Sequence, residues 1–263
     1  MGPAMTSQTK ITTNNASFKD HFSHDSAAYS MHRPGYPDSL FSFLSSITKK
    51  HDLAWDCATG SGQSAIRLAE SFNTVLATDA SEAQINNARK HKKVHYYVAA
   101  AENAAIKNSC VDLITVAQAM HWFDFDAFSS EVERTLKPSG ILAIWSYNLL
   151  SVNPDIDGQI KHLYGNILKP YWPAERSHVE NGYKSINLPL KELSTPAFHM
   201  SVKWTQAQLI SYLSTWSAVN TYIEKNNQNP VDIIQDELMR LCEKMAQMSV
   251  KWPLTVRAWQ QKD

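Results

Sequence analysis

The chain has 263 residues, of which 43% are hydrophobic, enough for one large α/β domain with additions. Its 25 Lys and Arg residues balance its 25 Asp and Glu residues, so no global charge draws it to nucleic acid or to an anionic membrane surface. No run of about 18 apolar residues predicts a transmembrane helix, and the polar N-terminus predicts no signal peptide. The widely spaced Cys57, Cys110 and Cys242 are typical of free thiols in a reducing compartment, so we expect a cytoplasmic protein.

Helical and extended patterns alternate through the first half of the chain. Helices are predicted at 37–49, 64–71, 81–91 and 126–136, and strands at 51–57, 73–78, 94–99, 111–117 and 141–147. Strands that are separated by helices pair in parallel through right-handed crossovers. This half therefore predicts a parallel sheet covered by helices.

The alternation breaks after Tyr147. Residues 148–195 contain prolines and aromatic residues with one weak helical pattern at 156–168, so they predict an insertion that covers a site and forms part of an acceptor pocket. Regular patterns return with a strand at 198–204, helices at 205–215 and 231–248, and a last strand at 250–259.

A glycine-rich turn follows the first predicted strand. Gly60 to Ala65 fits the pattern G-x-G-x-x-G/A of dinucleotide-binding proteins, which keeps an NAD-type oxidoreductase open. Asp56 ends the strand before the turn, and a carboxylate there would repel a pyrophosphate but attract a cation. S-adenosylmethionine is a sulfonium without phosphate, so Asp56 favours that cofactor. Asp79 follows Gly60 by about 19 residues, a spacing that suits the ribose of either cofactor.

These motifs resemble those of class I S-adenosylmethionine-dependent methyltransferases, in particular the small-molecule branch that includes trans-aconitate methyltransferases. Ala58 stands where the family usually begins its glycine motif with glycine, and Ala100 stands where it often has aspartate. The segments that also match are 100–102 beside the adenine, 118–122 beside the methyl donor, 137–140 before the fifth strand, and 29–37 over the cofactor.

The resemblance implies a three-layer Rossmann-like α/β fold with a mostly parallel seven-stranded sheet and an antiparallel last strand. It implies one domain over residues 1–263, in which residues 1–36 cover the cofactor. The cofactor is S-adenosyl-L-methionine, and the residues implied to bind it are Tyr29, Arg33, Asp56, Ala58, Gly60, Gly62, Asp79, Ala80, Ala101, Glu102 and Gln118.

His121 ends the fourth strand region and is a candidate general base. The alternative is a histidine that only hydrogen-bonds and shapes the pocket, because a carboxylate acceptor is already ionised. The residues expected to bind the acceptor are His121, Trp122, Tyr171, Trp172 and Tyr183. Two further aromatic residues, Trp204 and Trp216, could line the acceptor pocket or pack in the core. Three basic residues could bind an anionic acceptor or lie exposed to solvent: Arg176, His178 and Lys184.

The leading prediction is methyl transfer to a small molecule, at a carboxylate or other oxygen, by in-line displacement. An NAD-type oxidoreductase and a non-catalytic methyltransferase-like binding protein are the alternatives. We expect no metal site, because Asp124 and Asp126 are predicted to cap a helix and no zinc-binding spacing occurs. Neither nucleic acid nor membrane is expected as a partner, and the oligomeric state and the acceptor stay open.

Overall fold

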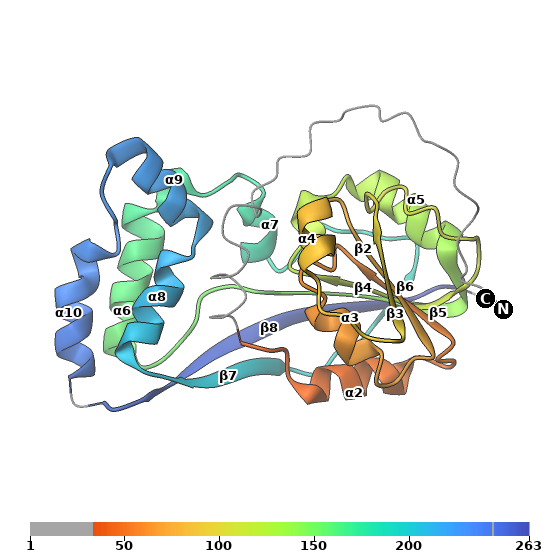
Figure 1. The fold of residues 1–263 in the computed structure, drawn as a ribbon, viewed down its shortest axis with the longest axis horizontal. Coiled ribbons are helices and arrows are strands. Elements are labelled where there is room, and N and C mark those ends of the chain that lie inside the picture. The colour runs from red at the N-terminus through yellow and green to blue at the C-terminus, as the bar shows by residue number, and fades with distance from the viewer. Residues whose placement is uncertain (1–33, 244, 263) are drawn as a thin grey trace.

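The structure, a computed structural model, describes residues 34–243 and 245–262. Its centre is an eight-stranded sheet in the order β3-β2-β1-β4-β5-β8-β6, with β7 also paired to β8 (Figure 1). The strands are β1 (Leu53–Cys57), β2 (Thr74–Asp79), β3 (Val94–Val98), β4 (Val111–Ala117), β5 (Leu136–Tyr147), β6 (Lys191–Leu193), β7 (Phe198–Trp204) and β8 (Met248–Gln260).

The predicted fold class is confirmed. Strands β1 to β5 pair in parallel, and β8 pairs antiparallel with β5, β6 and β7. The sheet has one strand more than the seven predicted, because β6 spans only three residues and leaves no alternating pattern in the sequence. The segment 137–140, expected before the fifth strand, lies within β5, where Ser139 adopts a positive φ of 60°.

Successive residues of the central strands pack on opposite faces of the sheet. One face, with Ala54, Leu113 and Ala143, is covered by α2 (Asp38–Ile47) and α3 (Gln63–Leu68). The other face, with Trp55 and Ile114, is covered by α5 (Phe125–Thr135) and α7 (Arg176–Glu180). Burial on both faces is what a parallel sheet between helices requires, and β1 and β4 are accordingly buried along nearly their whole length.

A second group of helices gathers at one end of the molecule, beside the long β7 and β8 strands (Figure 1). Its members are α6 (Pro154–His162), α8 (Gln206–Ser214), α9 (Ser217–Asn226) and α10 (Asp232–Cys242), and α10 contacts both α6 and α8. Trp252 of β8 is fully buried there, with its ring 5.1 Å from that of Trp204 and 5.4 Å from that of Tyr212. This helical layer therefore shares the core of the sheet's antiparallel edge.

Helix bounds differ from the prediction in this half. The helix predicted at 231–248 ends at Cys242, and α9 had no separate prediction. Residues 148–195 hold α6, a π-helical turn at Leu163–Ile167, a 3-10 turn at Lys169–Tyr171, α7 and β6. In the first half, α4 (Glu82–Asn87) is shorter than predicted, with Ser81 as its N-cap accepting from the Gln84 N–H. Across the described residues, every helix is too short or too polar to cross a bilayer.

Candidate cofactor and acceptor site

The loop after β1 turns sharply at the carboxyl edge of the sheet. Ala58, Gly60 and Gly62 adopt left-handed backbone conformations, with φ of 53°, 55° and 78°. The Thr59 N–H donates to the Thr78 carbonyl of the neighbouring β2 at 2.9 Å, which ties the loop to the sheet. The loop can hold this shape because two of the three positions are glycine, which bears left-handed φ without steric cost.

The two glycines have different surroundings. A Cβ on Gly62 would lie 2.2 Å from the Tyr96 hydroxyl oxygen, so a side chain there would collide with β3. A Cβ on Gly60 would have Gln84 Oε1, 4.0 Å away, as its nearest neighbour. Among the described residues, space is thus left beside Gly60, where a ligand can approach the main chain.

Asp79, at the end of β2, lies against this loop. Its Oδ2 accepts from the Gly60 N–H at 2.9 Å and its Oδ1 accepts from the Ser81 N–H at 2.9 Å. These two bonds fix the orientation of the carboxylate. An ionised carboxylate accepts several hydrogen bonds, so a residue of this type at the end of β2 suits the hydroxyl groups of a ribose.

Asp56 lies beneath the loop and not on its surface. Its carboxylate accepts from the Thr59 hydroxyl at 2.5 Å and from the Thr115 hydroxyl at 2.8 Å, and the residue is 1% exposed. Burial raises the pKa of Asp56 to about 6. The sequence allowed direct contact between Asp56 and a ligand, and this burial does not fit such contact. Asp56 instead stabilises the loop, and its charge can act on a cation only at a distance.

The segment between β3 and β4 carries Ala101, which is buried, and Glu102, whose Oε1 accepts from the Asp124 N–H at 3.0 Å. Asp124 is the N-cap of α5, as predicted, and accepts from two N–H groups of the first turn. Ala80, in the turn after Asp79, is exposed. Among the described residues no cluster of three or more His, Cys, Asp or Glu could hold a metal.

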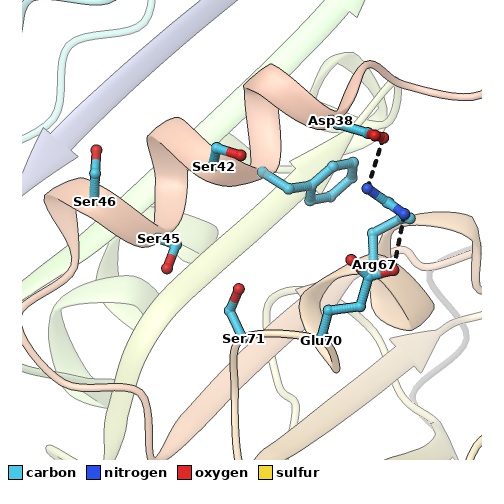
Figure 2. Close-up of a pocket in the computed structure, with 8 residues that line it drawn as sticks. Asp38, Ser42, Ser45, Ser46, Arg67, Glu70 and Ser71 are labelled. Atoms are coloured by element: carbon cyan, nitrogen blue, oxygen red, sulfur yellow. Dashed lines mark hydrogen bonds and ion pairs between the residues drawn. The ribbon is translucent and has the colours of Figure 1, made fainter.

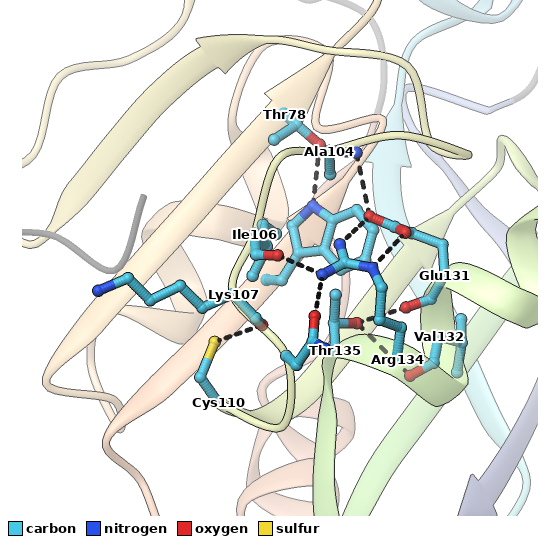
Figure 3. A network of polar contacts seen from close by, with 11 residues as sticks. Thr78, Ala104, Ile106, Lys107, Cys110, Glu131, Val132, Arg134 and Thr135 are labelled. Atoms are coloured by element: carbon cyan, nitrogen blue, oxygen red, sulfur yellow. Dashed lines mark hydrogen bonds and ion pairs between the residues drawn. The ribbon is translucent and has the colours of Figure 1, made fainter. Parts of the chain in front are cut away.

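A polar network that the sequence did not predict holds this segment to α5 (Figure 3). The Ala104 N–H donates to Glu131 Oε1 at 3.1 Å, and Arg134 donates to Glu131 and, through Nη1, to the Ile106 carbonyl at 2.6 Å. Glu131 is 7% exposed. The only sequence signal was an acid three residues before an arginine on a helix, which usually marks a solvent-exposed pair.

Gln118 directly follows β4 and adopts a positive φ of 57°. Its N–H donates to the Trp145 carbonyl at 2.9 Å and its Nε2 donates to the Tyr147 carbonyl at 3.2 Å. Gln118 thereby joins the ends of β4 and β5 at the crevice edge where open α/β sheets bind ligands.

His121 follows Gln118 and lies partly buried against Tyr183. Its Nδ1 is 2.9 Å from the Tyr183 hydroxyl, and the two rings are stacked with centroids 6.2 Å apart. Burial lowers the pKa of His121 to about 3, with the positive charge of Arg176 acting in the same direction. His121 is therefore neutral at physiological pH. A group with so low a pKa is a weak base, which favours the hydrogen-bonding alternative.

Aromatic residues border His121 on two sides. The Trp122 ring centroid lies 4.7 Å from that of His121, and fully buried Tyr183 lies beneath it. Trp172 packs on Tyr164, 4.8 Å between centroids, and on Trp216, 5.7 Å. Arg176 links the two groups, because its guanidinium lies 4.8 Å from the Trp172 ring centroid and its charge acts on His121.

One residue expected to bind the acceptor is not brought into this group. Tyr171 packs on Tyr222 of α9 and accepts from Asn226 through its hydroxyl, so its contacts lie in the helical layer. Tyr29 and Arg33 lie outside the described residues. Of the residues left open, Lys184 is exposed, His178 packs edge-on to Phe125, and Trp204 is a core residue.

A surface hollow of about 520 Å³ lies between α2 and the end of α3 (Figure 2). Its one cation, Arg67, pairs with Asp38 at 2.7 Å and with Glu70 at 2.8 Å. The positive charge of Arg67 is therefore already paired within the protein.

Comparisons with known proteins agree on one family. The family model described as "Methyltransferase domain" matches residues 55–144. A candidate methyltransferase of Dictyostelium discoideum is 36% identical over 227 residues, with 85% of this chain and 86% of that protein covered. A probable S-adenosylmethionine-dependent methyltransferase of Saccharomyces cerevisiae is 24% identical over 261 residues, with 83% and 88% covered. The solved structure of a candidate type II methyltransferase from Anaeromyxobacter dehalogenans has a TM-score of 0.82 and 36% identity, covering 88% of this chain and 99% of that one.

Proposed function

The chain belongs to the class I S-adenosylmethionine-dependent methyltransferases, and on this premise we propose that it methylates a small-molecule acceptor at a carboxylate or another oxygen nucleophile. The observation that supports this acceptor class is the state of His121. It is neutral and bonded to Tyr183, so the crevice offers a poor base and suits an acceptor that arrives already ionised.

The residues around the glycine loop fit the cofactor. The open side of Gly60 lets a ligand reach the main chain, and Asp79 is oriented to accept from the ribose hydroxyls. We assign Ala58 and Gly62 to the shape of the loop, Asp56 to its support, and Ala80, Ala101, Glu102 and Gln118 to the walls of the site. Tyr29 and Arg33 stay predictions, as does the covering role of residues 1–36.

When bound, S-adenosylmethionine supplies an electrophilic methyl group on a positively charged sulfur. The chain's own contribution is to hold the donor at the ends of β1 and β2 and the acceptor at the ends of β4 and β5. Alignment of two reactants is worth roughly 7–11 kcal/mol, so a site without a strong base can still accelerate the transfer. His121 and Tyr183 shape the acceptor side and exclude water, and residues 148–195 form part of that pocket.

Calorimetry with S-adenosylhomocysteine and with NAD tests the cofactor assignment. We expect binding of the first only, and Asp79→Ala should weaken it strongly because the ribose loses its acceptor. Unchanged affinity in Asp79→Ala would refute the ribose role. Binding of NAD and not of S-adenosylhomocysteine would favour the oxidoreductase alternative.

Transfer of a labelled methyl group to a panel of carboxylic acids, phenols and amines tests the acceptor class. We expect transfer to oxygen and none to amines. Cofactor binding without transfer to any compound would favour the non-catalytic alternative. A cytoplasmic location, expected from the sequence, belongs to the same proposal and is supported by the free thiols of Cys57, Cys110 and Cys242.

A further inference from the structure

Arg176, the first residue of α7, lies beside the residues to which we assign the acceptor, and part of its hydrogen-bonding capacity is unused. Its Nε donates to the Tyr164 hydroxyl at 3.0 Å, and its Nη2 donates to Asn148 Oδ1 at 2.8 Å. Within the described residues, no carboxylate lies within ion-pair distance of Arg176, and Nη1 donates no hydrogen bond. A guanidinium has five N–H groups, so three remain for a ligand.

Arg176 lies near the carboxyl ends of β4 and β5, where we place the acceptor. Asn148 directly follows Tyr147 at the end of β5, and the Tyr147 carbonyl accepts from Gln118 at the end of β4. The charge of Arg176 also acts on both His121 and Tyr183. These contacts place the guanidinium beside the carboxyl ends of β4 and β5, on the side of the sheet order away from Asp79.

The guanidinium is also held in place. It lies 4.8 Å from the Trp172 ring centroid and 5.5 Å from that of Tyr164, whose hydroxyl in turn donates to Glu180. Stacking and two hydrogen bonds fix a side chain that otherwise has many rotamers, so little entropy is lost when it binds a ligand.

From this arrangement we propose that Arg176 is the specificity-determining residue of the acceptor pocket, where its remaining N–H groups bind a carboxylate of the acceptor. The proposal rests on the methyl transfer proposed above and deepens it. A planar fork of donors matches a planar carboxylate in a bidentate way, and the surrounding rings of Trp172 and Tyr164 favour an acceptor with an apolar or aromatic body.

Methyl transfer to a carboxylate needs no base. A carboxylate oxygen of the acceptor forms the new C–O bond, the electron pair of the broken S–C bond goes to sulfur, and no proton moves. If the acceptor carries a second carboxylate, Arg176 holds one while the other reacts. A phenol or a neutral amide gains nothing from Arg176.

The test compares acids with their neutral counterparts. Benzoate, succinate and citrate, each beside its amide, are incubated with the full chain and labelled S-adenosylmethionine, and their binding to the S-adenosylhomocysteine-saturated protein is followed by ligand-observed NMR. We expect wild type to bind and methylate at least one acid and none of the amides. Arg176→Gln should raise the KM for that acid roughly 10- to 100-fold while the affinity for S-adenosylhomocysteine is unchanged. Arg176→Lys should recover part of the loss, because it keeps the charge without the fork.

Two further variants separate recognition from folding. Asn148→Asp leaves the stacking in place but gives Arg176 an internal carboxylate, so it should abolish the preference for acids. Arg240→Gln is the control, because it removes an arginine that pairs with Glu237 on the exposed face of α10.

Each outcome of these experiments supports or overturns the role of Arg176. Equal methylation of acids and amides, or an acid preference that survives in Asn148→Asp, would overturn the role of Arg176. Binding of S-adenosylhomocysteine without binding of any acid would also overturn it while leaving the methyltransferase proposal intact. Failure to bind S-adenosylhomocysteine would overturn the proposed function itself.

Discussion

Ala58 adopts a left-handed backbone conformation at the position where related methyltransferases usually have glycine. A residue with a Cβ pays roughly 1–2 kcal/mol for that conformation, and part of this is offset because alanine has less freedom than glycine in the unfolded chain. The chain therefore carries local strain in the loop of the proposed cofactor site.

Ala58→Gly should relieve this strain and raise the free energy of unfolding by about 0.5–1 kcal/mol. Chemical denaturation measures the change. Ala69→Gly is the matched control, because Ala69 has a φ of −62° and should lose stability on the same substitution. Equal losses in both variants would mean that the loop is not strained at Ala58.

The buried carboxylate of Asp56 makes stability depend on pH. Its pKa is raised to about 6 in the folded protein from an ordinary value of 3.8, so the folded state keeps a proton that the unfolded state releases between these values. Stability from this group is fully present below pH 3.8 and is lost as the pH rises through 6.

Asp56→Asn removes that titration. Relative to the variant, wild type should lose on the order of 3 kcal/mol of stability between pH 4 and pH 7. Urea denaturation across this range gives the difference, and Asp38→Asn, at an exposed site, should show no such trend. A constant difference between wild type and Asp56→Asn would place the pKa of Asp56 near its ordinary value.

Single residues also mark where prediction from the sequence stops. Gly60, Gly62 and Asp79 were predictable, because turn chemistry and spacing are local properties. The environment of Asp56 and the low pKa of His121 depend on other segments: Asp56 bonds to Thr115, and the pKa of His121 is lowered by burial and by the charge of Arg176. No local pattern of residues encodes those contacts.

At the scale of elements, the segment between β3 and β4 depends on α5. Arg134 donates to the Ile106 carbonyl and to Asn108 Oδ1, and Glu131 accepts from the Ala104 N–H. Because Ala101 and Glu102 precede these anchors, α5 positions the segment to which we assign a wall of the proposed cofactor site.

Arg134→Met should free this segment. We expect faster hydrogen exchange for the amides of residues 100–108 and a several-fold weaker affinity for S-adenosylhomocysteine, because binding must then order the segment. Arg240→Met is the control, since it breaks a similar arginine–glutamate pair on α10. Unchanged exchange at residues 100–108 would show that the network is not needed there.

Whether a helix or strand could be predicted depends on its length and on the regularity of its residue pattern. The strands β1, β2 and β4 and the helices α2 and α5 carry clear periodic patterns and were predicted within a few residues. The three-residue β6 and the five-residue α7 are too short for a pattern, and α9 follows α8 after only two residues. The packing of Arg176 against Trp172 and Asn148 was unpredictable for the same reason.

Across the whole molecule, the sheet and the helical layer share strands. Residues 254–260 of β8 pair with β5, and residues 248–254 of β8 pair with β7. Trp252 of β8 packs among the aromatic residues of the helical layer. A ligand at the far side of the sheet should therefore stabilise both parts together.

S-adenosylhomocysteine at 100 times its Kd should add about 2.7 kcal/mol to the free energy of unfolding, and NAD should add none. Thermal denaturation followed by circular dichroism measures the shift. Hydrogen exchange at the amides of α8 and α10 provides the second observable, because shared strands predict slower exchange there as well. Protection confined to β1–β4 would mean that the layer unfolds independently.

The order of the strands in the sheet has a consequence for synthesis. In the described chain, β6 and β7 pair with no strand except β8, which is the last to be made, and β8 lies between them and β5. While a ribosome is still translating, β1 to β5 can assemble, but β5 presents an unpaired edge until more than a hundred further residues have emerged. Such an edge is a template for contacts between nascent chains. A message broken before the codon for Met248 would therefore yield a product prone to aggregation, and not merely a shorter enzyme.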